Sequence, residues 1–143
     1  MKLQDQVSSL ELSKKLKELG VMQCNIWYWQ KQKSWFIHQH KPDRDENYSA
    51  FTVAELGEML PEAIRIKKQF RMLTLLKRET TNEKTRQTEM VYGYYYFDCV
   101  DGEGCKDQTP EIPEYDINEA DARAKMLIHL IENKLVDVKT LTN

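Results

Sequence analysis

Apolar residues recur at helical spacing in three stretches of the chain, which predict helices over residues 9–19, 53–60 and 119–135. In the first stretch, Leu12, Leu16 and Leu19 form one stripe opposite a charged face. The third stretch has the broadest apolar face and is expected to be the main helix of the core. The residues of that face are Ala120, Ala124, Leu127, Ile128, Ile131 and Leu135.

Local start and stop signals flank these three stretches. A Ser or Thr followed three residues later by Glu is typical of a capping box, and a Gly or Pro often follows the last turn of a helix. The expected amino-terminal caps are Ser8 with Glu11, Thr52 with Glu55, and Asn118, with Asp121 as the third residue of its helix. Gly20 and Pro61 are expected to end the first two helices.

Alternating and β-branched segments predict strands between the helices. Residues 21–30 and 34–38 indicate an antiparallel hairpin, and residues 89–99 form the clearest strand. Residues 64–66 and 70–77 also favour an extended chain, although a helix over 62–78 is an alternative. The segments 39–47, 79–86 and 98–116 are polar and are expected to be loops.

Together these elements predict an α+β fold in the order α-ββ-α-(β)ββ-α. We expect one antiparallel sheet of four to five strands with three helices packed on it, because the connections are short and no regular βαβ alternation occurs. A chain of 143 residues suits one domain over 1–143. Its two ends, 1–7 and 137–143, are expected to be flexible.

The composition is that of an ordinary globular protein, with 41% hydrophobic residues, 31% charged residues and a formal net charge of -2. No apolar run reaches the length of a membrane span, and the amino terminus lacks a signal-peptide pattern. We therefore expect a soluble cytoplasmic protein.

Its cysteines, Cys24, Cys99 and Cys105, are expected to be free thiols, with a Cys99–Cys105 bridge as the alternative.

Charge is distributed unevenly along the chain. Residues 63–88 carry eight basic and two acidic side chains, whereas 98–121 carries nine acidic and one basic. The basic segment can bind phosphates, or it can neutralise the acidic one within the chain or across a dimer. The candidate contacts to nucleic acid or an acidic partner are Arg65, Lys67, Lys68, Arg71, Lys77 and Arg78.

Aromatic residues share faces of two predicted strands. At least one set is expected to lie in the core, and a set left exposed would mark a partner site, because large exposed aromatic patches are uncommon on monomers. The candidate partner-binding residues are Trp27, Trp29, Tyr92, Tyr94 and Tyr96.

No catalytic, cofactor or metal site is predicted. His38 and His40 lack a second ligand pair at zinc spacing, and the acidic loop lacks the order of a calcium loop. Cys24 and His129 could meet as thiol and base, but ordinary packing is the favoured interpretation of both. No motif of nucleotide binding or hydrolysis occurs, so we do not expect an enzyme.

Three segments, 10–21, 49–61 and 119–135, resemble a family of small uncharacterised proteins encoded by bacteriophages, prophages and gut-bacterial mobile elements. The likeness spans most of residues 8–135 and, more loosely, is similar to the phage α/β/α sandwich domain. The resemblance implies no activity, cofactor or site residue. It implies a phage-type or prophage-type accessory protein in a bacterial cytoplasm.

The leading hypothesis is therefore an accessory protein without catalysis that binds a protein partner, for instance to interfere with a host or defence protein. Two other hypotheses remain: nucleic-acid binding by the basic segment 63–88, and self-association as a structural protein, including a homodimer.

Overall fold

The computed structural model describes residues 2–23, 27–31, 34–39, 47–66, 69–98, 108–109 and 116–141. Three α-helices occur there, α1 (Leu10–Glu18), α2 (Val53–Met59) and α3 (Glu119–Glu132), with two 3-10 turns, η1 (Leu3–Asp5) and η2 (Val138–Leu141). The strands are β1 (Tyr28–Lys31), β2 (Trp35–His38), β3 (Tyr48–Ser49), β4 (Ala63–Ile66), β5 (Gln69–Thr81), β6 (Thr88–Asp98) and β7 (Gln108–Thr109).

The strands form two antiparallel sheets, one in the order β2-β1-β3 and one in the order β4-β5-β6-β7. The α+β class is thus confirmed, whereas the single sheet of four to five strands is not. The two sheets contribute apolar side chains to two separate clusters. Trp29 packs in a small cluster with Val7 and Ala50, while the larger sheet covers the core around α3.

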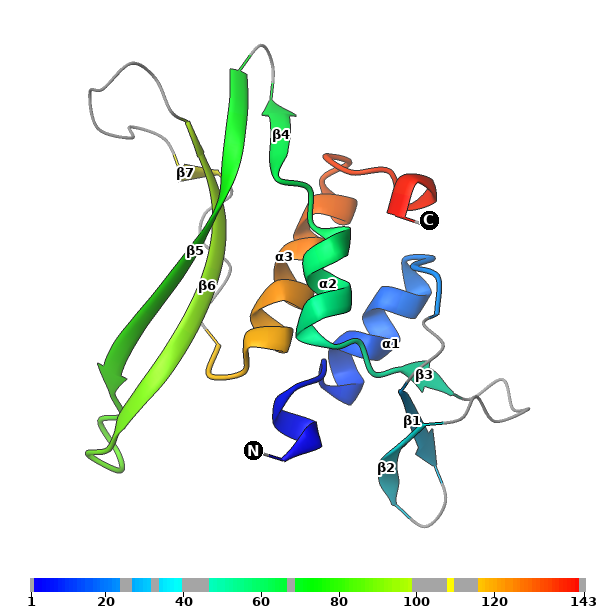
Figure 1. Ribbon diagram of the computed structural model, residues 1–143, viewed down its shortest axis with the longest axis vertical. Coiled ribbons are helices and arrows are strands. Elements are labelled where there is room, and N and C mark those ends of the chain that lie inside the picture. The colour runs from blue at the N-terminus through cyan, green and yellow to red at the C-terminus, as the bar shows by residue number, and fades with distance from the viewer. Residues whose placement is uncertain are drawn as a thin grey trace.

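Helix α3 is the centre of the molecule (Figure 1) and contacts β6, α1 and α2. Its apolar face is almost entirely buried, as the helical pattern predicts. Small side chains at Ala120, Ala122 and Ala124 allow its neighbours to approach closely. The core around it also buries Leu16 of α1, Phe51 and Leu56.

Two of the predicted capping arrangements are confirmed. Thr52 and Glu55 form a reciprocal capping box on α2, and the Asn118 side chain accepts a hydrogen bond from the Ala120 backbone N–H. Gly20 follows α1 with a φ of +87°, a left-handed conformation that favours glycine.

The predicted Ser8 cap is wrong, because the helix begins one residue later, after Ser9. Ser8 is buried instead, and its Oγ accepts a hydrogen bond from the Phe51 backbone N–H and shares another with Ser13 Oγ. A long-range contact has replaced the local one.

The strands predicted over 64–66 and 70–77 are observed as β4 and β5, in place of the alternative helix over 62–78. Two predicted boundaries change. Strand β5 continues to Thr81, into the predicted loop 79–86. The side chain of Asn82 closes the turn by accepting hydrogen bonds from the backbone N–H groups of Lys84 and Thr85. Strand β1 begins only at Tyr28, and the described residues 21–23 before it are not extended into the sheet.

Both ends of the described chain contain regular structure. Val7 is completely buried and bridges to Thr52, although the sequence pattern predicts nothing regular over 1–7. Near the other end, η2 places Leu141 against the main core. Within the predicted loop 98–116, β7 pairs with β6, and Asp116 exchanges backbone hydrogen bonds with Tyr92.

Candidate protein-binding surface

The aromatic residues of the first sheet are mostly interior. Trp29 is buried, and its indole Nε1 donates a hydrogen bond to the Ser8 carbonyl oxygen at 2.9 Å. Trp27 is half-buried against the same small cluster. The predicted partner-binding role of Trp29 is therefore wrong for this conformation, because its ring and its N–H are both satisfied within the chain.

Tyr94 is likewise buried between β6 and α3. Its hydroxyl donates a hydrogen bond to Glu119 Oε1 at 2.8 Å, and the Arg123 guanidinium lies 4.9 Å from the ring centroid. Burial and the Glu119 carboxylate raise the pKa of the Tyr94 phenol. Tyr94 is thus a structural residue, not the partner-binding residue predicted.

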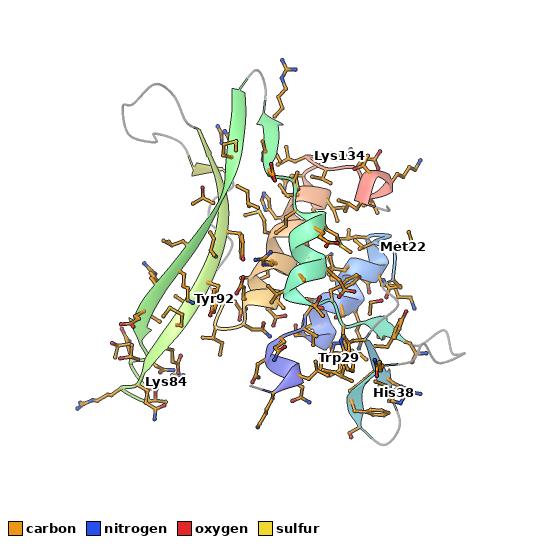
Figure 2. All side chains as sticks on the ribbon, viewed as in Figure 1. Met22, Trp29, His38, Lys84, Tyr92 and Lys134 are labelled. Atoms are coloured by element: carbon orange, nitrogen blue, oxygen red, sulfur yellow. The ribbon has the colours of Figure 1, made fainter. Side chains whose placement is uncertain are left out.

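Tyr92 lies on the same face of β6, close to where α3 begins (Figure 2). It is half-buried, and the Lys77 ammonium stands 5.4 Å from its ring centroid. The side chain of Tyr96, the third tyrosine of this face, lies outside the described part of the structure.

The predicted basic residues do not form one surface. Arg71 is only 7% exposed, and within the described residues neither its Nε nor its Nη1 has a hydrogen-bond partner. Arg65, Lys77 and Arg78 are exposed, but Lys77 and Arg78 point to opposite faces of β5 because neighbouring strand residues alternate. Lys67 and Lys68 lie outside the described residues. Arg71 is therefore not a surface contact for nucleic acid.

The most exposed regular structure is the far half of the β5–β6 hairpin, residues 77–90, which we call the hairpin arm. Figure 1 shows it extending beyond the first turn of α3, and Figure 2 shows Lys84 at its tip. Most of its described side chains are exposed. It carries four basic residues and three acidic ones: Lys77, Arg78, Lys84 and Arg86, against Glu79, Glu83 and Glu89.

One edge of this arm has no neighbouring strand among the described residues. Strand β4 pairs with β5 only over Gln69 to Met72, and the Leu73 N–H donates one further bond, to Glu62 O at 2.8 Å. Because backbone groups alternate sides in an antiparallel ladder, Leu75 and every second residue after it direct N–H and C=O groups away from β6. These residues are Leu75, Lys77, Glu79 and Thr81.

Leu75 adds an apolar side chain to this edge. It is 44% exposed. Across the ladder it stands opposite the buried Tyr94. The free edge of residues 74–81 thus combines unpaired backbone groups with exposed apolar area.

A cavity of about 610 Å³ lies elsewhere, among the end of α2, β4 and η2. Its lining mixes apolar side chains such as Met59, Ile64 and Leu141 with Glu58 and Arg65. No histidine, cysteine or lysine belongs to that lining as described, and its charged groups are Glu55, Glu58, Asp137 and Arg65. In Figure 1 the elements that line it, the end of α2, β4 and η2, lie away from the hairpin arm.

No group of residues that could hold a metal ion occurs in the described ranges. His38 stands at the exposed end of β2, and His129 is half-buried on α3. Cys24, His40, Cys99 and Cys105 lie outside the ranges, as do most of the acidic residues of 98–116.

No family model, curated protein or solved structure matches this chain. None of the helices in the described part has the length and apolar character that crossing a membrane requires.

The free edge was not predicted, but its signal is present in the sequence. The alternation continues past residue 77 through Thr80 and Thr81, two β-branched residues that favour a strand. The charged residues around them are typical of a loop, and they obscure that continuation.

Proposed function

We propose that this chain is an accessory protein without catalysis, of the phage or mobile-element kind, that acts by binding another protein, and that the hairpin arm is its binding surface. The observation that carries this proposal is the free edge of residues 74–81 on an exposed, projecting hairpin. The wider proposal that the partner belongs to a bacterial host or its defences comes from the family resemblance alone.

The backbone of the free edge supports this proposal. An unpaired strand edge offers a row of donors and acceptors that a second strand can pair with at little steric cost, and many proteins bind peptides in this way. Soluble proteins usually protect such an edge with charged side chains, a proline, a bulge or a covering segment. Residues 74–81 contain no proline and pair regularly with β6. Their charges, Lys77, Arg78 and Glu79, are of both signs, so a strand of complementary charge can still pair with this edge.

Nucleic-acid binding is less favoured by the same surface. The arm's four basic residues are nearly balanced by three acidic ones, and Arg71 is buried. Binding to phosphates depends on net positive charge that releases counterions. A nearly neutral arm favours a protein partner.

The test compares full-length protein with a variant that lacks the arm, in which Asn-Gly replaces residues 79–90 and joins Arg78 to Val91. These two residues pair directly in the ladder, so a two-residue turn can close the shortened hairpin. Tagged forms of both proteins are used for affinity capture from bacterial lysate. The ratio of the absorbance at about 260 nm to that at about 280 nm reports bound nucleic acid.

We expect a protein captured in stoichiometric amount by the full chain and lost from the armless variant. Glu132→Ala, a surface change on α3 far from the arm, is the control and should retain the partner. Equal capture by full-length and armless protein would contradict the proposal, and so would the absence of any captured protein.

A further inference from the structure

We propose that the free edge of residues 74–81 pairs with the same edge of a second copy of this chain, joining two β4-β5-β6-β7 sheets into one across a two-fold axis. This inference rests on the proposed role of the hairpin arm as a binding surface, and it assigns the free edge to a second copy of this chain rather than to a different protein. The edge is self-complementary in backbone register, in charge and in length.

The register follows from which backbone groups are available. Only Leu75, Lys77, Glu79 and Thr81 direct their groups outward, so hydrogen-bonded pairs must join members of this set. All four are used when Leu75 lies opposite Thr81 of the second copy and Lys77 lies opposite Glu79. Each of these pairs exchanges two hydrogen bonds, and the symmetry repeats them.

Charge selects this register over its neighbours. Opposite charges directly across an antiparallel pair are stabilising, and like charges are destabilising. In the proposed register Lys77 faces Glu79 twice, whereas a shift by one hydrogen-bonded step in one direction places Lys77 against Lys77. A shift by one step in the other direction places Glu79 against Glu79 and Leu75 opposite Glu83.

The length of the free edge also fits. The paired stretch ends at Leu75, and β4 of the same chain takes over from Leu73, so β5 of the second copy and β4 follow one another along this edge of β5 without overlap. Antiparallel pairing places the arms side by side and the helices at opposite ends. Figure 1 shows the helices beside the upper part of the hairpin, which leaves the arm accessible for such pairing.

One position opposes association. On the other face of the sheet, Arg78 meets Arg78 of the second copy at the two-fold axis. Each Arg78 already makes an interaction within its own chain. Replacing it with threonine, which favours strands and pairs well with itself, should tighten the dimer.

The experiment measures mass by light scattering and sedimentation over a wide range of protein concentration. The unmodified chain should reach twice the mass of one chain. Lys77→Glu (K77E) and Glu79→Lys (E79K) each create two like-charge pairs and should weaken dimerisation about tenfold or more. A mixture of the two variants brings two acids against two lysines, so it should form a dimer more readily than either variant alone.

Far-ultraviolet circular dichroism of each variant establishes that it is folded. Arg78→Thr (R78T) is the register test, and it should strengthen association by several fold. A chain that stays monomeric at millimolar concentration would overturn the proposal, as would a mixture of K77E and E79K that associates no better than its components.

The mass measurement and the capture experiment fail independently. A monomeric chain that still captures a protein through its arm would remove the dimer and leave the proposed function. A dimer that captures nothing else would retain the edge pairing and remove binding to a different protein.

Discussion

The Asp121 carboxylate, in the first turn of α3, accepts a hydrogen bond from the Ser9 backbone N–H at the start of α1, with 2.6 Å between the two atoms. A single side chain thereby lies near the amino-terminal ends of two helices. Both helix ends carry partial positive charge and unsatisfied N–H groups, so one carboxylate stabilises both. The contact joins residues that are 112 positions apart and sets how α1 packs on α3.

Replacing Asp121 with alanine should therefore reduce the free energy of unfolding by about 2 kcal/mol, because the Ser9 N–H loses its acceptor in a partly buried place. Urea denaturation measures the loss. The control is Glu132→Ala, which breaks the exposed Lys15–Glu132 ion pair between the same two helices and should cost less than about 1 kcal/mol. Equal losses in the two variants would contradict the assigned role.

Asp121→Asn separates the charge from the hydrogen bond. Burial raises the pKa of Asp121, although the bond from Ser9 opposes this. A carboxyl group whose folded pKa is raised stabilises the fold most below its unfolded pKa, and this contribution is lost as pH rises through the folded pKa. The asparagine keeps an acceptor without the buried charge, so at neutral pH it should lose less stability than the alanine. Unfolding curves of both variants at pH 7 measure the difference.

The positions of the helices could be predicted from the sequence because their signals are local. Stripes of apolar residues and the Thr52–Glu55 capping box lie within a few residues of each other, and both are observed. The Ser8–Glu11 pattern is identical in kind, yet Ser8 bonds to Phe51 across 43 positions. A tertiary contact of this kind leaves no local pattern.

The candidate surface could be predicted only in part. The alternation of β6 indicates that Tyr92 and Tyr94 share a face, but it does not say that α3 covers that face. Charged residues beyond Lys77 are equally typical of a loop and of an exposed hairpin. Whether β5 has a free edge depends on how far β4 extends, and that is set by pairing between segments rather than by composition.

Val7→Ala tests the ordered amino-terminal segment. The Val7 side chain is completely buried in the small cluster with Trp29 and Ala50, so removing two methyl groups should cost about 2 kcal/mol. Met22→Ala is the control, because that side chain is 55% exposed and its loss should change stability by less than about 0.5 kcal/mol. Thermal and urea unfolding measure both. A negligible effect at Val7 would mean that this segment does not belong to the folded unit.

Tyr94→Phe tests the bond between β6 and α3. The ring stays in place while Glu119 loses one donor, so the fold should lose about 1–2 kcal/mol at neutral pH. Tyr92→Phe changes the neighbouring tyrosine of the same strand face and is the matched control, with little expected effect. Chemical denaturation of the two variants and the unmodified chain gives the comparison.

The same pair predicts a dependence on acid pH. Burial opposes ionisation of Glu119, but hydrogen bonds from Arg123 and Tyr94 outweigh it, so its pKa lies below the usual 4.5. A lowered folded pKa contributes stability above the unfolded pKa, and this contribution is lost as pH falls through the folded pKa. The difference in unfolding free energy between the unmodified chain and Tyr94→Phe should therefore shrink in acid. If this difference stays constant down to about pH 3, the ionisation of Glu119 is not its cause.

His129 provides the last prediction, near neutral pH. Burial lowers the pKa of His129 below 6.5, although the neighbouring Glu132 carboxylate acts in the opposite direction. In its neutral form a ring nitrogen can accept a hydrogen bond from Asn133 Nδ2, which stands 3.2 Å from Nε2. Protonation makes both ring nitrogens donors and removes that acceptor. The folded chain therefore disfavours the charged imidazole.

The stability that His129 contributes should be present above pH 6.5 and should be lost as pH falls through its folded pKa, because the unfolded chain binds the proton more readily. Proton NMR of the imidazole Hε1 gives the pKa, with His129→Gln assigning the signal. Glu132→Gln removes the opposing carboxylate and should lower the pKa further. A His129 midpoint at or above 6.5, or a midpoint that rises in Glu132→Gln, would contradict burial as the dominant cause.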